Sequence, residues 1–176
     1  MNDKYFRDFL GLVDNKTTDI HKHFSMYNAL SKVAFQTKKA SYSDYDLQKM
    51  VGGFSREVNS QCSKLLETIS DIFTKSGRKL SAKQYNILID MCTKTFTTII
   101  DNYKTAFQEE FNMSDTLEIQ FRLCEEDVSN KINKHIKALK ILINTKIDKA
   151  LWWTAIGTVF AGVSLILSVV AIIVAN

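Results

Sequence analysis

The chain has 176 residues, and its 23 Lys and Arg side chains outnumber its 19 Asp and Glu side chains, for a net charge of +4. Much of that excess lies in a lysine-rich stretch over residues 131–149, so the charge gives little support to a nucleic-acid-binding protein. The three cysteines are far apart and form no Cys-x-x-Cys pair, which argues against a disulfide framework or a zinc site.

Because proline is absent and only 6 glycines occur, few residues would interrupt a helix. The first predicted element is a short amphipathic segment over residues 3–13, and a separate helix follows over residues 18–37. One face of that helix carries the residues expected to be buried, which repeat at helical spacing. They are Ile20, Phe24, Tyr27, Ser31 and Ala34.

Two longer helices follow, and each begins at a capping box. Ser43 with Asp46 starts the first, and Gly77 is placed where such a helix ends. Ser81 with Gln84 starts the second. The buried face of the first comprises Leu47, Val51, Phe54, Val58, Cys62, Leu65, Ile69 and Ile72. The buried face of the second comprises Tyr85, Leu88, Cys92, Phe96, Ile99, Tyr103 and Phe107. The cysteines on these faces are therefore predicted to be small core residues.

The last helix begins at Ser114 or Asp115. Its expected buried face comprises Leu117, Phe121, Cys124, Val128, Ile132, His135, Leu139, Leu142 and Lys146. The same spacing continues past residue 150 without a turn signal, which predicts one helix of about 60 residues, roughly 90 Å long. The predicted fold is thus all-α. An antiparallel helical bundle occupies residues 1–149, and its long last helix continues into a single C-terminal transmembrane helix over residues 150–176.

Residues 151–176 contain no charged side chain. As a helix, the apolar part would measure roughly 37 Å, enough to cross a hydrocarbon core of ~30 Å, and a buried core helix is the alternative. Its position excludes a signal peptide, so we expect a tail-anchored protein. The membrane interface is predicted at Lys146, Lys149, Trp152 and Trp153. The lysines favour a single-pass protein of the inner (cytoplasmic) membrane with its N-terminal domain in the cytoplasm, and residues 131–149 are expected to attract anionic lipid.

Small residues recur along the predicted span at alternating spacings of three and four. They are Ala150, Thr154, Gly157, Ala161, Ser164, Ser168, Ala171 and Ala175. Because helices in lipid associate by close backbone approach, this stripe predicts a homo-oligomer. A ring of such helices would enclose a narrow pore, whereas two helices would form a plain dimer. The bundle is also rich in phenylalanine, and we expect some of these rings to face a neighbouring subunit.

Catalytic motifs are scarce in the predicted bundle. It has no phosphate-binding loop, no His-Glu-x-x-His and no Gly-x-Ser-x-Gly, so no cofactor and no metal are predicted. His21 and His23 are two residues apart on different faces of a helix, and we expect both at the solvated surface. His135 lies on an apolar stripe, either as a hydrogen-bonded core residue or as a functional one.

Residues 129–135, Ser-Asn-Lys-Ile-Asn-Lys-His, resemble a degenerate HEPN motif, with Asn130 at its polar position and His135 at its histidine. HEPN ribonucleases bring two such motifs together across a dimer, where Arg and His act on the RNA phosphodiester. Ser129 stands at the position of that Arg, which leaves the developing phosphorane charge without its stabilising group. With its terminal span, the chain resembles the small membrane accessory proteins of type VI-B CRISPR systems, which strengthen interference against phage.

Three functions follow from these features. The first is an oligomeric, non-enzymatic membrane pore or membrane-perturbing effector that enhances CRISPR antiphage defence. Its partners would be the lipid bilayer, further copies of itself and an RNA-guided RNA-targeting nuclease, with RNA binding left undecided. The second is a membrane-tethered HEPN-type ribonuclease, with Asn130 and His135 as its candidate catalytic residues. The third is a non-enzymatic tail-anchored scaffold, a class to which SNAREs and apoptosis regulators belong.

Overall fold

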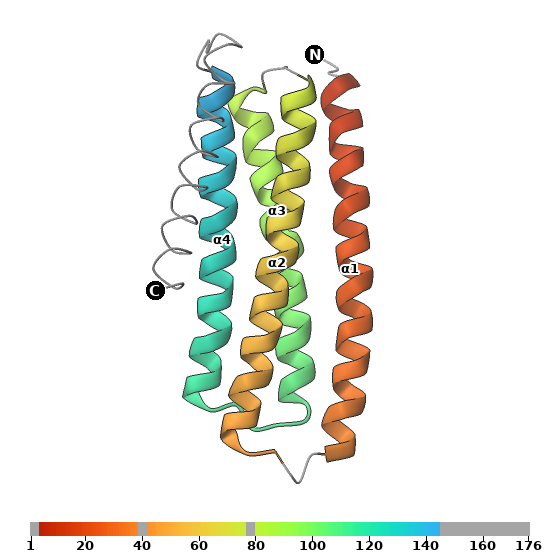
Figure 1. The fold of residues 1–176 in the computed structure, drawn as a ribbon, viewed down its shortest axis with the longest axis vertical. Helices are drawn as coiled ribbons and strands as arrows, with labels where there is room; N and C mark the ends of the chain where they lie inside the picture. The colour runs from red at the N-terminus through yellow and green to blue at the C-terminus, as the bar shows by residue number, and fades with distance from the viewer. Residues whose placement is uncertain (1–3, 39–41, 77–79, 145–176) are drawn as a thin grey trace, which may run out of the picture. The chain divides into compact units, whose positions relative to one another are not determined.

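The computed structural model describes residues 4–38, 42–76 and 80–144. Within these ranges it contains four helices and no strand: α1 (Lys4–Lys38), α2 (Asp44–Ser76), α3 (Ala82–Gln108) and α4 (Asp115–Asn144) (Figure 1). The predicted all-α fold is therefore confirmed. The chain divides into two compact units, Met1–Lys140 and Ile141–Asn176, and almost all of the described residues belong to the first.

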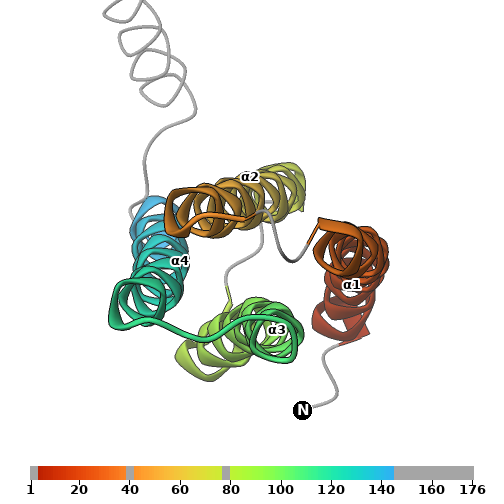
Figure 2. The same ribbon diagram turned by 90° about the horizontal axis from the view of Figure 1, so that it is seen from below.

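Successive helices run in opposite directions and are joined at alternate ends of the bundle (Figure 1). Seen end-on, the helices occupy four corners, with α4 diagonally opposite α1 (Figure 2). This arrangement confirms the predicted antiparallel helical bundle. It also means that α1 and α4 run in opposite directions, and that the C-terminal end of α4 lies at the same end of the bundle as the N-terminal end of α1.

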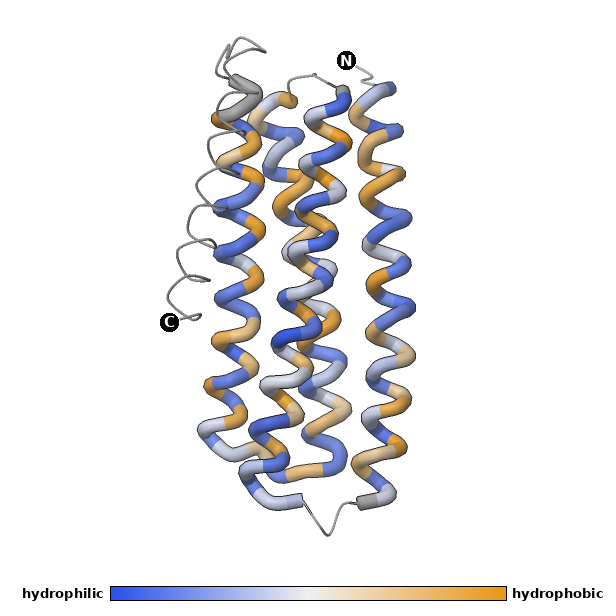
Figure 3. Tube along the Cα trace, viewed as in Figure 1, coloured by the Kyte–Doolittle hydropathy of each residue, from blue (hydrophilic) through white to orange (hydrophobic). Residues whose placement is uncertain are grey.

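Apolar and polar residues alternate along each helix at helical spacing, and the apolar set forms the core (Figure 3). At its centre Phe54 of α2 stacks on Tyr103 of α3, with ring centroids 3.9 Å apart. Phe54 also contacts Phe24 of α1 and Phe121 of α4, so a single ring joins all four helices. The prediction that some phenylalanines of the bundle face a neighbouring subunit is wrong. Nearly all of the described ones are buried within the bundle, and the two most exposed are Phe6, at 8%, and Phe111, which packs on Phe35.

The first helix corrects the predicted division between residues 3–13 and 18–37. α1 is continuous from Lys4 to Lys38, because no residue between the two segments breaks the helix. Thr17 is only 5% exposed, and its hydroxyl donates a hydrogen bond to the backbone carbonyl of Asp14 at 2.9 Å. With its hydroxyl satisfied by the preceding turn, this threonine continues the buried face from Val13 to Ile20.

The predicted buried faces are otherwise largely confirmed, with shifts of one residue. On α4 the buried residue is Ile136 rather than His135, and the burial of Leu142 and Lys146 lies outside what the structure describes. At the end of α1 the buried residue is Phe35 rather than Ala34, and at the end of α2 it is Phe73 rather than Ile72. A strict repeat of 3.5 residues drifts by ~20° per heptad against a straight helix of 3.6 residues per turn. Over helices of 35 and 33 residues that drift brings the next residue onto the core side.

Three serines begin helices as predicted. The backbone N–H of Asp46 donates to Ser43 Oγ at 3.3 Å, and the N–H of Ser43 donates to Asp46 Oδ2 at 3.0 Å. Ser81 and Gln84 form the reciprocal pair at the start of α3, at 3.3 and 2.7 Å. At the start of α4, Ser114 Oγ accepts from the backbone N–H three residues later at 3.4 Å. Each cap satisfies a donor that the helix itself leaves unpaired.

The predicted membrane segment lies outside the described residues. So do Gly77, the proposed interface residues Lys146, Lys149, Trp152 and Trp153, and the small residues Thr154, Gly157, Ala161, Ser164, Ser168, Ala171 and Ala175. None of the helices in the described ranges has both the length and the apolar character needed to cross a bilayer. α4 is helical as far as Asn144, and its predicted continuation lies beyond that point.

Candidate functional site

The candidate site residue His135 belongs to a band of polar side chains between α2 and α4. We define this α2–α4 seam by Asn59, Ser63, Ser70, Lys131 and His135, all of which are half-buried. Residues four apart on a helix lie on one face, so these spacings bring the α2 residues toward α4 and the α4 residues toward α2. The seam therefore borders the apolar core and faces solvent on its other side.

His135 is a hydrogen-bond donor in this seam. Its Nε2 lies 2.6 Å from Ser70 Oγ, and that hydroxyl donates its one proton to the backbone carbonyl of Leu66 at 2.8 Å. The contact with Ser70 therefore requires a proton on Nε2. Burial lowers the pKa of His135 below its ordinary value. A backbone hydrogen bond to Leu66 and the charge of Glu67 act in the opposite direction and raise the pKa, but burial is the largest effect. The imidazole is thus neutral at pH 7, and it does not act as the base that would activate Ser70.

Lys131 is held by α2. Its Nζ donates to Ser63 Oγ at 3.1 Å, to Asn59 Oδ1 at 3.3 Å and to the Asn59 carbonyl at 3.4 Å. These contacts satisfy the ammonium group within the bundle. The expectation that every lysine of residues 131–149 attracts lipid therefore needs correction for Lys131, whereas Lys137 and Lys140 are exposed.

The structure brings the two HEPN-like candidates to one surface. Asn130 is exposed and His135 is half-buried, and both line a shallow, open depression of about 550 Å³. Asp127, Lys131 and Lys134 complete its lining. Because the Lys131 ammonium bonds to α2, Lys134 is the cation best placed to meet a bound anion, and Asp127 opposes it. The arrangement suits weak binding of a phosphate group better than chemistry on it.

No guanidinium accompanies His135 among the described residues. Arg122 precedes it by 13 positions on α4, which corresponds to about 20 Å along the helix. Arg56 precedes Ser70 by 14 positions on α2, or about 21 Å. Arg7 lies on α1, diagonally across the bundle (Figure 2). The Arg–His pair of HEPN ribonucleases therefore has no counterpart in this part of the chain.

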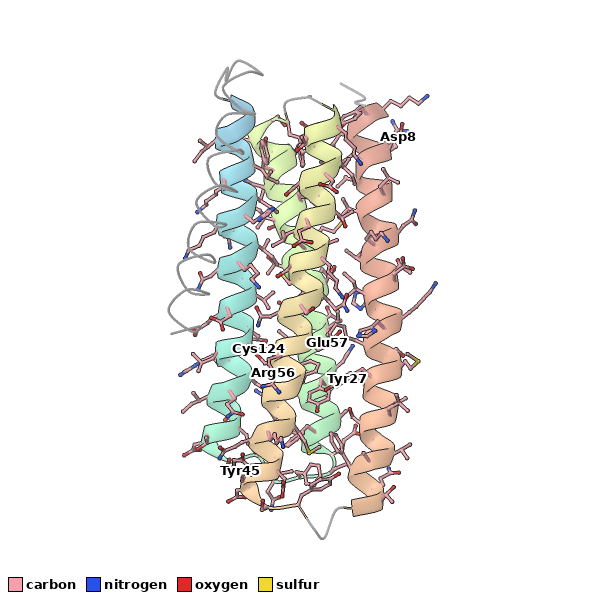
Figure 4. All side chains as sticks on the ribbon, viewed as in Figure 1. Asp8, Tyr27, Tyr45, Arg56, Glu57 and Cys124 are labelled. Atoms are coloured by element: carbon pink, nitrogen blue, oxygen red, sulfur yellow. The ribbon has the colours of Figure 1, made fainter. Side chains whose placement is uncertain are left out.

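A second polar contact joins α1 to α2, and no sequence pattern predicts it. Glu57 lies on the side of α2 that faces α1, and its carboxylate is 2.9 Å from Nε2 of His23 (Figure 4). Gln61 also donates to this carboxylate, at 2.8 Å. The hydrogen bond from Gln61 lowers the pKa of Glu57, burial opposes that effect, and His23 adds to it. The prediction that His23 is simply solvated is therefore wrong, since it bridges two helices.

The three cysteines are buried free thiols, which confirms that they are core residues. Burial raises the pKa of Cys62 to about 11 and that of Cys92 to about 12, and it also raises the pKa of Cys124. Thiols of this kind remain protonated at neutral pH and react slowly. In the described ranges, no three His, Cys, Asp or Glu side chains are grouped so that they could hold a metal ion.

No protein-family model matches this chain, and no curated protein and no solved structure shows significant similarity to it.

Proposed function

We propose that this protein is a single-pass membrane protein in which residues 151–175 cross the bilayer and the four-helix bundle is a non-enzymatic assembly module. The observation that carries the proposal is the uncharged run of residues 151–176. Such a run is long enough to span the hydrocarbon core as a helix, and transferring one charged side chain to its centre would cost about 2.5–3.5 kcal/mol. The complete absence of charge is the pattern that insertion favours.

The bundle supports a mechanical role for α4. Phe121 anchors this helix in the aromatic core, and Lys131 and His135 bind it to α2 farther along. A helix fixed at several levels transmits a displacement of its end to the rest of the bundle, because packed interiors resist compression. If α4 continues as a helix, Lys140 stands about 15 Å from residue 150, compared with about 28 Å for Lys131. Since charges are screened over ~8 Å, only Lys146 and Lys149, which would stand about 6 and 2 Å from residue 150 on such a helix, would attract anionic lipid strongly.

The effector function rests on the small-residue stripe from Thr154 to Ala175. Close packing of these faces would bring several spans together and either enclose a narrow lumen or disturb the lipid around them. From the resemblance to type VI-B accessory proteins, we infer that this activity damages the membrane during phage defence, together with an RNA-guided RNA-targeting nuclease. Phage plating efficiency, measured with the nuclease in the presence and absence of this protein, tests that role.

The first experiment measures the mass of the detergent-solubilised protein. A closed oligomer of more than four subunits is expected for the wild type, and a smaller species for Gly157→Leu with Ala161→Leu, because leucine separates the backbones. The matched control, Val159→Leu with Ile166→Leu, changes the opposite faces of the span and should retain the oligomer. A monomer that is indifferent to both pairs would reduce the span to a simple anchor. Leakage from liposomes that contain the oligomer then separates a pore from a plain assembly.

A HEPN-type ribonuclease is the second candidate, favoured by the shared depression of Asn130 and His135. It is the weaker one because His135 is a neutral donor to Ser70 and lacks a neighbouring guanidinium in the described ranges. Cleavage of single-stranded RNA by the full-length protein, abolished in His135→Ala and retained in Asn133→Ala, would reverse that order.

A further inference from the structure

We infer that neighbouring copies of this chain join through a heterologous contact, in which the outer face of α1 in one copy packs against the outer face of α4 in the next. This inference rests on the proposed self-association and names its interface in the bundle. Two exposed apolar patches carry it. The α1 patch consists of Met26, Leu30 and Val33, which are 62%, 65% and 62% exposed. The α4 patch consists of Ile119 and Leu123, which are 46% and 49% exposed.

Each patch forms a stripe along one helix. The spacings of three and four residues place the members of a patch on one face, and that face is the solvent side, because the core residues lie on the other. The two helices occupy diagonally opposite corners (Figure 2). A single copy therefore presents one patch to each of two neighbours, and the patches of one copy do not meet each other.

The aromatic core fixes the relative heights of the two patches. Tyr27 of α1 and Phe121 of α4 both pack on Tyr103, at 5.8 and 6.1 Å between ring centroids. Phe24 and Phe121 likewise both pack on Phe54, at 5.7 and 6.4 Å. Residues near 27 on α1 and near 121 on α4 therefore share a level along the bundle axis.

The opposite directions of the two helices then set a register. At a rise of 1.5 Å per residue, Leu30 lies level with Ile119, and Met26 lies level with Leu123, each to within about one residue. Copies related by rotation about an axis parallel to the bundle axis keep their heights. Met26 and Leu30 of α1 would thus each meet an apolar side chain of α4 in the neighbouring copy, whereas Val33 would lie level with Asp115.

Charge distinguishes this contact from a symmetric one. In the same register Lys22 lies level with Glu126, and both side chains are exposed. Glu126 is 3.9 Å from Arg122 on its own helix, a loose pair that leaves it able to bind a second cation. An α1–α1 contact at equal height would oppose Lys22 to Lys22, and an α4–α4 contact would oppose Glu126 to Glu126. Only the α1–α4 contact pairs opposite charges.

The wider charge pattern agrees. Residues 21–37 of α1 contain lysines and no carboxylate, whereas residues 115–127 of α4 contain five carboxylates and one arginine. Some of these charges already form pairs within the bundle, as Lys32 does with Glu109. A contact of this heterologous kind continues from copy to copy and closes into a ring when the rotation allows. The common membrane plane prevents the axial rise that would turn the ring into a filament.

Cross-linking of the full-length protein in membranes tests the contact directly. Leu30→Cys with Ile119→Cys, treated with a short bis-maleimide, should give a ladder of dimers, trimers and larger species. The native cysteines are buried, so the wild-type protein serves as the blank. The matched control replaces Ile119→Cys with Ile87→Cys, an exposed position on α3, and should give no ladder. A dimer formed by Leu30→Cys alone would show a symmetric α1–α1 contact and overturn the inference.

Charge exchange gives the second readout. Lys22→Glu and Glu126→Lys should each reduce the cross-linked ladder by a factor of about two to five, which corresponds to the loss of one exposed ion pair, and the double exchange should restore it. If the oligomer persists by mass while no ladder forms, the inference fails and the proposed function stands. If the wild-type protein is monomeric in the membrane, the proposed function fails as well.

Discussion

Removal of the Phe54 ring should be the most damaging single truncation in the core. Phe54 is 0% exposed and contacts Phe24, Tyr27, Tyr103 and Phe121, which come from all three other helices. A buried Phe→Ala change costs about 3–5 kcal/mol through lost burial and the cavity that remains. Aromatic pairs add about 0.5–1.5 kcal/mol each, though not additively. We therefore expect Phe54→Ala to lower the free energy of unfolding by about 5 kcal/mol, a large part of the stability of a small domain.

Urea unfolding of the full-length protein in detergent, followed by circular dichroism at 222 nm, measures this cost. The matched control is Phe6→Ala, because Phe6 is 8% exposed and lies in the first turns of α1, where helices fray. We expect it to cost about 2 kcal/mol less than Phe54→Ala, with the slope of the free energy against urea unchanged. If the two variants lowered the free energy of unfolding equally, the inference that the Phe54 ring is the centre of the core would be refuted.

Three further predictions concern the seam, a helix cap and a thiol. Because burial lowers the pKa of His135 in the folded state, the unfolded state binds more protons below the ordinary value of 6.5, so stability should fall as pH drops from 7 to 5. His135→Gln should flatten that decrease in urea midpoints measured across this range. Ser81→Ala should lower the free energy of unfolding by about 1 kcal/mol by removing the capping box, whereas Ser81→Asn should cost less. Cys92, with its pKa raised to about 12, should resist maleimide at pH 7 until urea unfolds the protein, as mass spectrometry would show; fast labelling of the folded protein would contradict its burial.

Much of the fold was predictable because helices are specified by neighbouring residues. The capping boxes at Ser43 and Ser81 act over three positions, and the buried faces repeat every three or four. The failures also have local causes. The break expected before residue 18 does not occur, because the threonine at its centre satisfies its own hydroxyl. The shift from Ala34 to Phe35 follows from the difference between 3.5 and 3.6 residues per turn.

The candidate site was predictable only in part. His135 was identifiable as a polar residue on an apolar stripe, and Asn130 by its distance from it along the chain. Their shared depression follows from the helix that carries both. The hydrogen bond to Ser70 decides that His135 is a donor. Because it joins residues 65 positions apart in sequence, it could not be predicted from the spacing of neighbouring residues.

The sequence by itself determined where α2, α3 and α4 begin, most of the faces that the helices bury and where charge is absent, because these properties depend on residues within one or two turns. The tertiary structure alone decided which faces meet. It places His23 against Glu57, holds Lys131 at Asn59 and sets the α1 and α4 patches at one height on opposite corners. The physical reason is that many pairings of four amphipathic helices would bury similar apolar area. Ring packing around Phe54 and a few polar contacts across the seams select one of them.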